Sequence, residues 1–311
     1  MSPTEPVFSD FPDPLKKYFL ATRPAFLLAT LVPVFLGLAY THWLGVSVHV
    51  WHAILTILAA LFLHAGVNVL NDYYDDLNGT DNVNEERVYP FTGGSRFIQN
   101  GVFSRQQMLR YGIYLNLIVV IIGVYLVTET GSALFFLGMI GLLIGWAYSA
   151  PPLRLNSRGF GELAILIGFS LLPFGTVLVQ TGLLLPEVIL IALPVGFLTT
   201  NLLYINQFPD RKADIKAGKL HWVARMDLQT ARWGYLAIGF LAYSVLMLLI
   251  LTEQLPLVSL ISLLPVMLTL KAFMILWKKA DQPQQLEPAI KMTILAMILH
   301  GGLLTLSFII A

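Results

Sequence analysis

The sequence contains no cysteine, and only 12% of its 311 residues are charged. The absence of cysteine excludes disulfide bonds, a thiol nucleophile and thiolate metal sites. Lysine and arginine (19 residues) nearly balance aspartate and glutamate (18 residues), and the net charge of +1 creates no field that would attract a nucleic acid. The first residues are polar and rich in proline, so no cleavable signal peptide is expected.

Apolar side chains, by contrast, are abundant. Hydrophobic residues make up 57% of the chain and the mean hydropathy is +0.74, whereas a soluble domain is about 45–50% apolar and about 25% charged. We therefore predict an all-α polytopic membrane protein, a bundle of nine transmembrane helices that forms one integral-membrane domain over residues 1–311, with the lipid bilayer as its surroundings. The predicted spans lie near residues 24–43, 51–71, 108–128, 132–149, 161–181, 187–207, 231–251, 256–277 and 289–310. Residues 1–23 are predicted to form a cytoplasmic lead-in with a short interfacial helix around Pro14 to Thr22.

Positive charge lies on one side of the predicted bundle. All nineteen lysines and arginines precede the first span, lie in the loops that follow even-numbered spans, or lie within a few residues of those ends. Apart from histidines, the opposite loops carry only Glu129, Glu187 and Glu253 as ionisable charges. The positive-inside rule then predicts a cytoplasmic N-terminus, cytoplasmic acidic loops and, after nine spans, a C-terminus on the outside.

A dense acidic cluster follows the second span. Four aspartates occur within ten positions, at residues 72, 75, 76 and 81. If the apolar helix continues through Asp76, then Asn71, Asp72 and Asp75 project from one side, because helical neighbours lie three and four residues apart. Clustered carboxylates repel one another and favour a counter-ion. Oxygen ligands alone favour magnesium or calcium over softer metals.

A second cluster repeats this chemistry four helices later. Asn71-x-x-x-Asp75 closes the second span, and Asn206-x-x-x-Asp210 closes the sixth, with Asp214 one turn further on. Matching polar groups in two halves of a membrane protein indicate a shared site between the halves. Pro209 lies within the second cluster and is expected to kink or fray the helix end.

Basic residues are interleaved with these acids. The first cluster is followed by Arg87 and Arg96, and the second by Lys212 and Lys219. A third loop, residues 148–162, adds a tyrosine at the membrane edge and arginines: Tyr148, Arg154 and Arg158. Magnesium is typically held by a few carboxylates together with substrate phosphate oxygens, which arginine and lysine also recognise. The pattern therefore predicts a diphosphate held by Mg²⁺ at a chamber on the cytoplasmic side.

These motifs together resemble the UbiA superfamily of intramembrane prenyltransferases. The resemblance rests on the Asn-Asp-x-x-Asp run after the second span, the Asp-x-x-x-Asp pair after the sixth, and the Tyr-Ser-x-Pro-Pro loop between the fourth and fifth. It implies Mg²⁺ as cofactor and polyprenyl diphosphate and an aromatic acceptor as substrates. The metal ligands implied or suggested by position are Asn71, Asp72, Asp75, Asp81, Asn206, Asp210 and Asp214. The diphosphate contacts are Arg87, Arg96, Arg154, Lys212 and Lys219, and the catalytic residues are Asp72, Asp75, Asp210 and Tyr148.

One branch of that superfamily is the most similar. The string GTDNVNEERVYPFTGGSRFIQNG, residues 79–101, resembles the branch that prenylates 1,4-dihydroxy-2-naphthoate, with decarboxylation, in menaquinone synthesis. The residues after Lys219 are Leu220, His221 and Trp222, which depart from the pattern of that branch. Prenylation of 4-hydroxybenzoate, homogentisate or another phenol therefore remains an alternative. The resemblance implies a bacterial inner (plasma) membrane as the location.

A membrane transporter is the alternative from a different class of protein. A cation-coupled secondary transporter would also need intramembrane acids, but near the midplane and not at one end. Asp76 is predicted to face solvent, and Arg105 to anchor its helix end to lipid headgroups. His64 is predicted to be a hydrogen-bonded structural histidine, with a catalytic base as the alternative, and Glu162 is given a structural role.

Overall fold

The computed structural model describes residues 5–311, so the first four residues of the predicted lead-in lie outside it. Over these residues the chain is all-helical, without strands, and has nine helical segments long and apolar enough to cross a membrane. The prediction of a nine-helix membrane protein is confirmed. The spanning segments are α2 (Pro24–Trp43), α3 (Val50–Asn78), α5 (Arg105–Thr130), α6 (Ser132–Ser149), α8 (Gly161–Thr181), α9 (Glu187–Lys216), α11 (Leu228–Leu251), η2 with α12 (Leu257–Leu263 and Val266–Lys279) and α13 (Glu287–Ile310).

Short helices decorate the ends of this bundle. They are η1 (Phe8–Asp10), α1 (Pro14–Ala21), α4 (Thr80–Val83), α7 (Leu155–Arg158), α10 (Trp222–Arg225) and η3 (Pro283–Gln285). The helix α1 begins with Asp13 as its N-cap and a proline at its first position. It lies where the sequence predicted a short helix in the lead-in.

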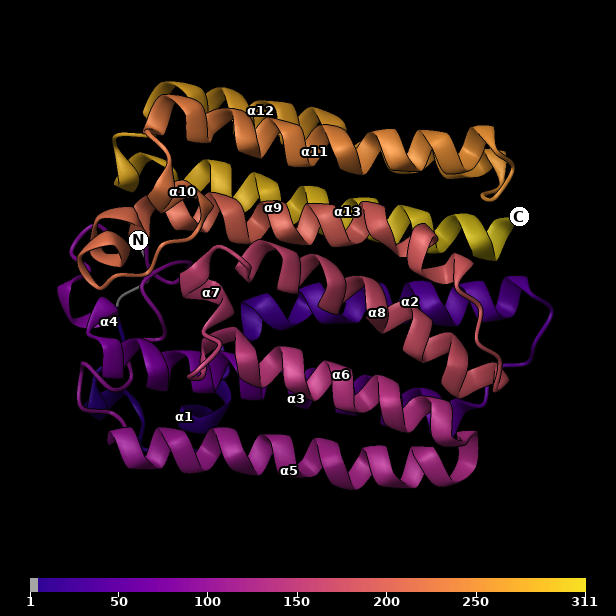
Figure 1. Ribbon diagram of the computed structural model, residues 1–311, viewed down its shortest axis with the longest axis horizontal. Coiled ribbons are helices and arrows are strands. Elements are labelled where there is room, and N and C mark those ends of the chain that lie inside the picture. The colour runs from indigo at the N-terminus through magenta and orange to yellow at the C-terminus, as the bar shows by residue number, and fades with distance from the viewer. Residues whose placement is uncertain (1–4) are drawn as a thin grey trace.

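The long helices run side by side along the horizontal axis of Figure 1. α3 packs on α5, α8 packs on both α2 and α9, and α13 packs on α2, α9 and α12. α9 is the most buried of the spanning helices, and its apolar residues join those of α11, α12 and α13 in the largest core cluster. This central position brings the acidic end of α9 toward the other half of the bundle.

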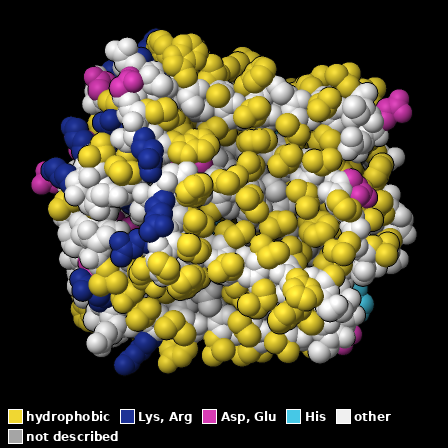
Figure 2. All heavy atoms as spheres, in the orientation of Figure 1, with side chains coloured by type: hydrophobic (Ala, Val, Ile, Leu, Met, Phe, Trp, Pro, Cys, Tyr) yellow, Lys and Arg dark blue, Asp and Glu magenta, His cyan; other side chains and the backbone are white. Residues whose placement is uncertain are grey.

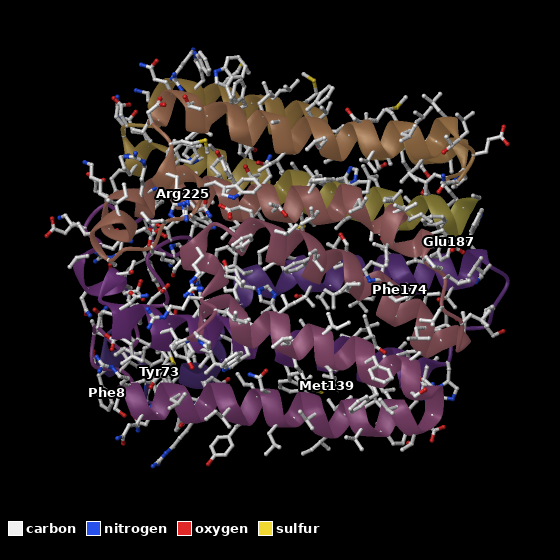
Figure 3. All side chains as sticks on the ribbon, in the orientation of Figure 1. Phe8, Tyr73, Met139, Phe174, Glu187 and Arg225 are labelled. Carbon is white, nitrogen blue, oxygen red and sulfur yellow. The ribbon has the colours of Figure 1, made fainter. Side chains whose placement is uncertain are left out.

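The two ends of the bundle differ in charge. Figure 2 shows Lys and Arg side chains gathered at one end, and a continuous hydrophobic surface over the middle. Figure 3 places Tyr73 and Arg225 at the charged end and Glu187 at the opposite end, with Phe174 and Met139 between them. In Figure 1 the short helices α1 and α4 lie at the charged end and the C-terminus lies at the other. This distribution is that of an integral membrane protein.

Two helices are longer than their predicted apolar spans. α3 continues through the first acidic cluster to Asn78 and is capped by Gly79, which has a φ of +83°. α9 continues through Pro209 to Lys216, so the predicted fraying at this proline is not observed. Both acidic motifs are therefore carried on helices, which fixes the direction in which their carboxylates project.

Candidate active site

The two acidic motifs meet through one buried lysine. Lys219 follows α9 after a turn at Gly218, whose φ is +74°. Its Nζ lies 2.9 Å from Asp75 Oδ2 on α3 and 3.5 Å from Asp214 Oδ1 on α9. The side chain of Lys219 is only 14% exposed. The predicted convergence of the two motifs at one end of the bundle is thus observed in the structure.

The loop between α4 and α5 joins the same two motifs a second time. Asn84 Nδ2 donates to Asp210 Oδ1 at 2.6 Å, and the backbone N–H of Gly93 donates to Asp210 Oδ2 at 3.3 Å. A few residues later the backbone N–H of Ser95 donates to Asp72 Oδ2 at 3.2 Å. This loop therefore fixes one carboxylate of each motif.

Glycine at position 94 lets this loop pass over the first motif. A Cβ at Gly94 would lie 2.5 Å from Asp81 Oδ2 and 3.1 Å from Asp72 Oδ1, and its φ is +72°. Only a residue without a Cβ fits both the conformation and the close approach. The two carboxylate oxygens consequently face the same small space beside the loop.

Electrostatics at this end is dominated by burial and by the crowding of acids. Burial, together with the negative charges of Asp75 and Asp72, raises the pKa of Asp81 well above its ordinary value. Although burial acts to lower it, the carboxylates of Asp214 and Asp75 hold the pKa of Lys219 well above its usual value. Lys219 therefore stays positively charged. The surrounding carboxylates outnumber it, so a further cation would stabilise them.

Arg87 and Arg96 lie near the acidic motifs, but their hydrogen bonds and ion pairs are to Glu5 and to backbone carbonyls. Arg87 donates from Nε to Glu5 Oε1 at 2.6 Å and also bonds the backbone carbonyl of Asn84. Arg96 bonds the backbone carbonyl of Asp81 and lies 3.6 Å from Glu5 Oε2. Although burial acts to raise it, the hydrogen bonds from Asn100 and Arg87 and the charges of the two arginines lower the pKa of Glu5.

Two other predicted diphosphate contacts lie away from the acids. Arg154 is exposed, in a left-handed conformation with φ of +44°, immediately before α7. The side chain of Lys212 is 70% exposed and pairs with Glu86 at 2.5 Å. On α9, position 212 lies two residues from both Asp210 and Asp214, and residues two apart do not share a helix face. In the described structure neither side chain contacts the acidic motifs.

The prediction that Asp76 faces solvent is wrong. Asp76 is 6% exposed, and its Oδ2 accepts from Arg105 Nε at 2.6 Å. Gln99 and Asn82 donate to its other oxygen. Arg105, expected to anchor a helix end in headgroups, instead neutralises this buried carboxylate. The pair fastens α3 to the start of α5.

Several site residues were missed by sequence reasoning. Arg23 Nη1 lies 3.9 Å from Asp72 Oδ1, and its guanidinium lies 4.8 Å from the Phe26 ring. His221 Nε2 bonds Asp214 Oδ2 at 2.8 Å. A lone arginine before a membrane span is typical of an interfacial anchor, so Arg23 could not be recognised as a site residue from the sequence. The departure from the family pattern at Leu220–Trp222 is the sequence feature that marks His221.

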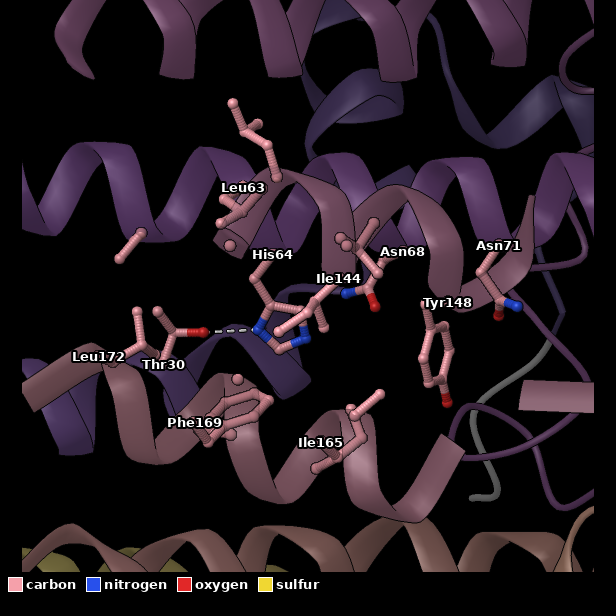
Figure 4. A pocket seen from close by; sticks show the side chains of 18 of the residues that line it. Thr30, Leu63, His64, Asn68, Asn71, Ile144, Tyr148, Ile165, Phe169 and Leu172 are labelled. Carbon is pink, nitrogen blue, oxygen red and sulfur yellow. Dashed lines mark hydrogen bonds between the residues drawn. The ribbon is translucent and has the colours of Figure 1, made fainter. Parts of the chain in front are cut away.

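The acidic end opens into a long, largely apolar cavity with a volume of about 690 Å³. Its polar mouth is lined by Asn71, Asp75, Asp81, Tyr148, Asn206, Asp210, Asp214 and Lys219, with Arg23 and His221. From there it extends between α3, α5, α6 and α8 to residues at the far end of the bundle, such as Leu134 and Phe135. Figure 4 shows Asn71 and Tyr148 facing this space together. The cavity can hold a molecule with an anionic head and a long apolar tail.

The oxygen atoms at the mouth fit a hard divalent cation that substrate and water also help to hold. Within residues 5–311, no three Asp, Glu or His side chains lie close enough together to hold a metal ion by themselves. Four buried oxygens of the described site nevertheless lack a hydrogen-bond donor, namely Asp72 Oδ1, Asp81 Oδ2, Asn206 Oδ1 and Asp214 Oδ1. Magnesium keeps several ligand positions for substrate phosphate and water, so a sparse set of oxygens fits it. The ammonium of Lys219 lies between Asp75 and Asp214 and pairs with both carboxylates.

Comparisons with known proteins agree with this architecture. The model of the UbiA prenyltransferase family matches residues 30–295. The 1,4-dihydroxy-2-naphthoate octaprenyltransferase of Haemophilus influenzae is 30% identical over 227 residues, covering 70% of this chain and 71% of that protein. The Bacillus subtilis enzyme of the same name is 28% identical over 202 residues, covering 64% of this chain and 62% of that protein, less than two thirds of its length.

Solved structures show the shared fold. A UbiA homolog from Archaeoglobus fulgidus, solved bound to GPP and Mg²⁺, has a TM-score of 0.65 at 17% sequence identity and covers 93% of this chain and 99% of that chain. The same homolog bound to DMAPP and Mg²⁺ has a TM-score of 0.66 at 20% identity. Because the family model matches residues 30–295, which is most of its length, this chain belongs to the UbiA prenyltransferase family.

Proposed function

We propose that this protein transfers a polyprenyl group from polyprenyl diphosphate to 1,4-dihydroxy-2-naphthoate, with loss of carbon dioxide, in menaquinone biosynthesis. One observation carries the proposal: two acidic motifs from distant helices meet at the polar mouth of a long apolar cavity. The head of the diphosphate belongs at the mouth and the prenyl tail in the cavity. A transporter site would lie near the midplane, whereas these acids lie at one end of α3 and α9.

We propose Mg²⁺ as the cofactor that binds at this mouth. When bound, it would neutralise diphosphate charge and act as a Lewis acid on the leaving group. The candidate ligands are Asn71, Asp72, Asp75, Asp81, Asn206, Asp210 and Asp214. The described oxygens without donors and the A. fulgidus homologs solved with Mg²⁺ and prenyl diphosphates support this choice.

Protein cations would complete the charge balance around the diphosphate. Lys219 lies between the motifs, and Arg23 lies beside Asp72 and lines the cavity. Arg87 and Arg96 hold the loop that carries Gly93 and Gly94, so they act on the diphosphate through that loop. These charges stabilise the pyrophosphate that accumulates negative charge as the C–O bond breaks.

The reaction itself would take place just inside the mouth. The bond between prenyl C1 and the diphosphate oxygen breaks, and its electron pair leaves with pyrophosphate. Tyr148, which lines the cavity, presents an aromatic ring to the allylic carbon as it becomes positive. The apolar walls exclude water, which would otherwise capture that carbon.

The acceptor then supplies the electron pair for the new C–C bond. The ring carbon of 1,4-dihydroxy-2-naphthoate that bears the carboxylate attacks C1, and carbon dioxide leaves from the same carbon to restore the aromatic ring. The names of the H. influenzae and B. subtilis relatives support this acceptor. The bacterial origin of these relatives and the charge on one end support a bacterial inner membrane, with the N-terminus and the acidic mouth on the cytoplasmic side.

An assay with purified protein tests the function. The protein in detergent is incubated with Mg²⁺, prenyl diphosphates of several lengths and 1,4-dihydroxy-2-naphthoate, and products are identified by mass spectrometry. A prenylated, decarboxylated naphthoquinol is expected. Product only with 4-hydroxybenzoate or homogentisate would replace the proposed acceptor, and no product with any pairing would overturn the function.

A further inference from the structure

His64 is a polar side chain in the apolar part of the cavity. Neither the binding of diphosphate nor the cleavage of the C–O bond at the mouth requires it. It lies on α3, two turns before Asp72 and therefore about 12 Å deeper along the helix. His64 lines the cavity with Leu63, Val67 and other apolar residues. Among the described lining residues, it is the one ionisable side chain on this deeper stretch. A prenyl tail has no atom that needs such a group.

One nitrogen of His64 is held in place and the other faces the cavity. Nδ1 lies 2.6 Å from the hydroxyl of Thr30 on α2, and the ring lies edge-on to Phe169 on α8. Figure 4 shows this bond and the ring projecting into the space between Ile144 and Phe169. Nε2 has no hydrogen-bond partner within the described residues.

The hydrogen bond to Thr30 determines whether His64 Nε2 is a donor or an acceptor. Thr41, Thr176 and Thr199 donate their hydroxyl protons to the carbonyl one turn earlier in their own helices. Thr30 makes no such bond in the described structure, and its hydroxyl bonds only to Nδ1. Its proton is therefore free to be donated to Nδ1, which leaves the ring hydrogen on Nε2 as a donor into the cavity.

Asn68 provides a complementary acceptor one turn nearer the mouth. Its Nδ2 donates to the carbonyl of Thr22 at 3.0 Å, which leaves Oδ1 to the cavity. Side chains four residues apart on a helix have Cβ atoms about 5–6 Å apart. That spacing suits two oxygen substituents on opposite sides of one aromatic ring. Figure 4 shows His64, Asn68 and Asn71 in order along α3, with Tyr148 opposite.

We propose that His64 positions the aromatic acceptor by donating a hydrogen bond from Nε2 to one of its ring oxygens, with Asn68 Oδ1 accepting from the other. This inference rests on the proposed prenyl transfer and assigns a positioning role, with no proton transfer required of His64. The contact holds the ring beside prenyl C1 at the mouth. It also gives the site a preference for acceptors with two ring oxygens.

Three variants test this positioning role. His64→Asn keeps a polar group near Nδ1 and loses the one at Nε2, while His64→Gln places an amide nitrogen near the position of Nε2. Loss of one neutral hydrogen bond should raise the acceptor KM about 10-fold in His64→Asn, leave the prenyl diphosphate KM within about 2-fold, and be largely rescued in His64→Gln. Thr41→Val is the control, because Thr41 bonds the carbonyl one turn earlier in its own helix and is not among the residues that line the cavity.

Inhibition by two naphthoates, each lacking one ring hydroxyl, separates recognition from a merely structural role. The wild-type protein should bind both of them more weakly than the dihydroxy compound, because each lacks one of the two proposed hydrogen bonds, and His64→Asn should lose the discrimination against one of the two. Equal changes in both KM values, or unchanged discrimination for both analogues, would overturn the inference. Since wild-type turnover is measured in the same experiment, its absence would instead count against the proposed function.

Discussion

Replacement of Gly94 by alanine tests the geometry of the acidic mouth most sharply. The added Cβ would lie 2.5 Å from Asp81 Oδ2 and 3.1 Å from Asp72 Oδ1, so both carboxylates must move. A shift of about 1 Å in a reacting constellation costs about 100-fold in rate, which is about 2.7 kcal/mol of activation free energy. The φ of +72° adds about 1–2 kcal/mol of backbone strain, which lowers stability in addition to the rate.

Gly101→Ala is the matched control for that strain. Gly101 lies in the same loop with a φ of +70°, and a Cβ there would have no neighbour within 4 Å. Both variants should lose similar thermal stability, measured by unfolding in detergent, and only Gly94→Ala should lose about 100-fold in kcat at saturating Mg²⁺. If Gly94→Ala retains a kcat within about 3-fold of that of Gly101→Ala, the proposed role of the carboxylates beside this loop is wrong.

Three further predictions concern the charged residues. Lys219→Met should lower kcat/KM at least about 100-fold and destabilise the protein by about 3–5 kcal/mol, because it leaves buried carboxylates unpaired. The control is Lys212→Met at an exposed position, which should keep kcat/KM within about 2-fold and leave the stability nearly unchanged. Equal effects of the two substitutions would contradict the role assigned to Lys219. Asp210→Ala should abolish turnover in the prenylation assay while unfolding still shows a folded protein, and unimpaired turnover would remove Asp210 from the metal site. Glu162→Ala should raise the rate of protease cleavage between α9 and α10, since Glu162 Oε1 accepts from Gln207 Nε2 and from the backbone of Trp222; an unchanged cleavage rate would show that this carboxylate does not hold the loop.

The sequence predicted the fold well because the membrane imposes long apolar helices. The span predicted at 24–43 coincides with α2, and that at 161–181 with α8. Errors occur where hydropathy ends before the helix does. α3 and α9 continue into polar sequence, where the loop between α4 and α5 donates hydrogen bonds to their carboxylates.

The site was predicted in part, for reasons of spacing. Asp75 lies four residues after Asn71, and Asp214 lies four residues after Asp210, so each pair shares a helix face at the same end of the bundle. The convergence of the two motifs could therefore be predicted. Choosing among the cations required the structure, because Lys212 and Lys219 are close in sequence yet only Lys219 follows the turn that returns to the acids. Arg23 could not be found from its sequence neighbours, because its partner Asp72 lies on another helix.

Both acidic motifs are proposed to bind one metal-bound diphosphate. A double-mutant cycle measures the coupling free energy between the two motifs in that binding. Binding of a non-reacting prenyl thiolodiphosphate in Mg²⁺ is titrated calorimetrically for the wild type, Asp75→Asn, Asp210→Asn and the double variant. We predict that each single change weakens binding at least about 30-fold, and that the double variant binds little worse than either single one. Losses that multiply, or a single change without effect, would show that the motifs act on separate ligands.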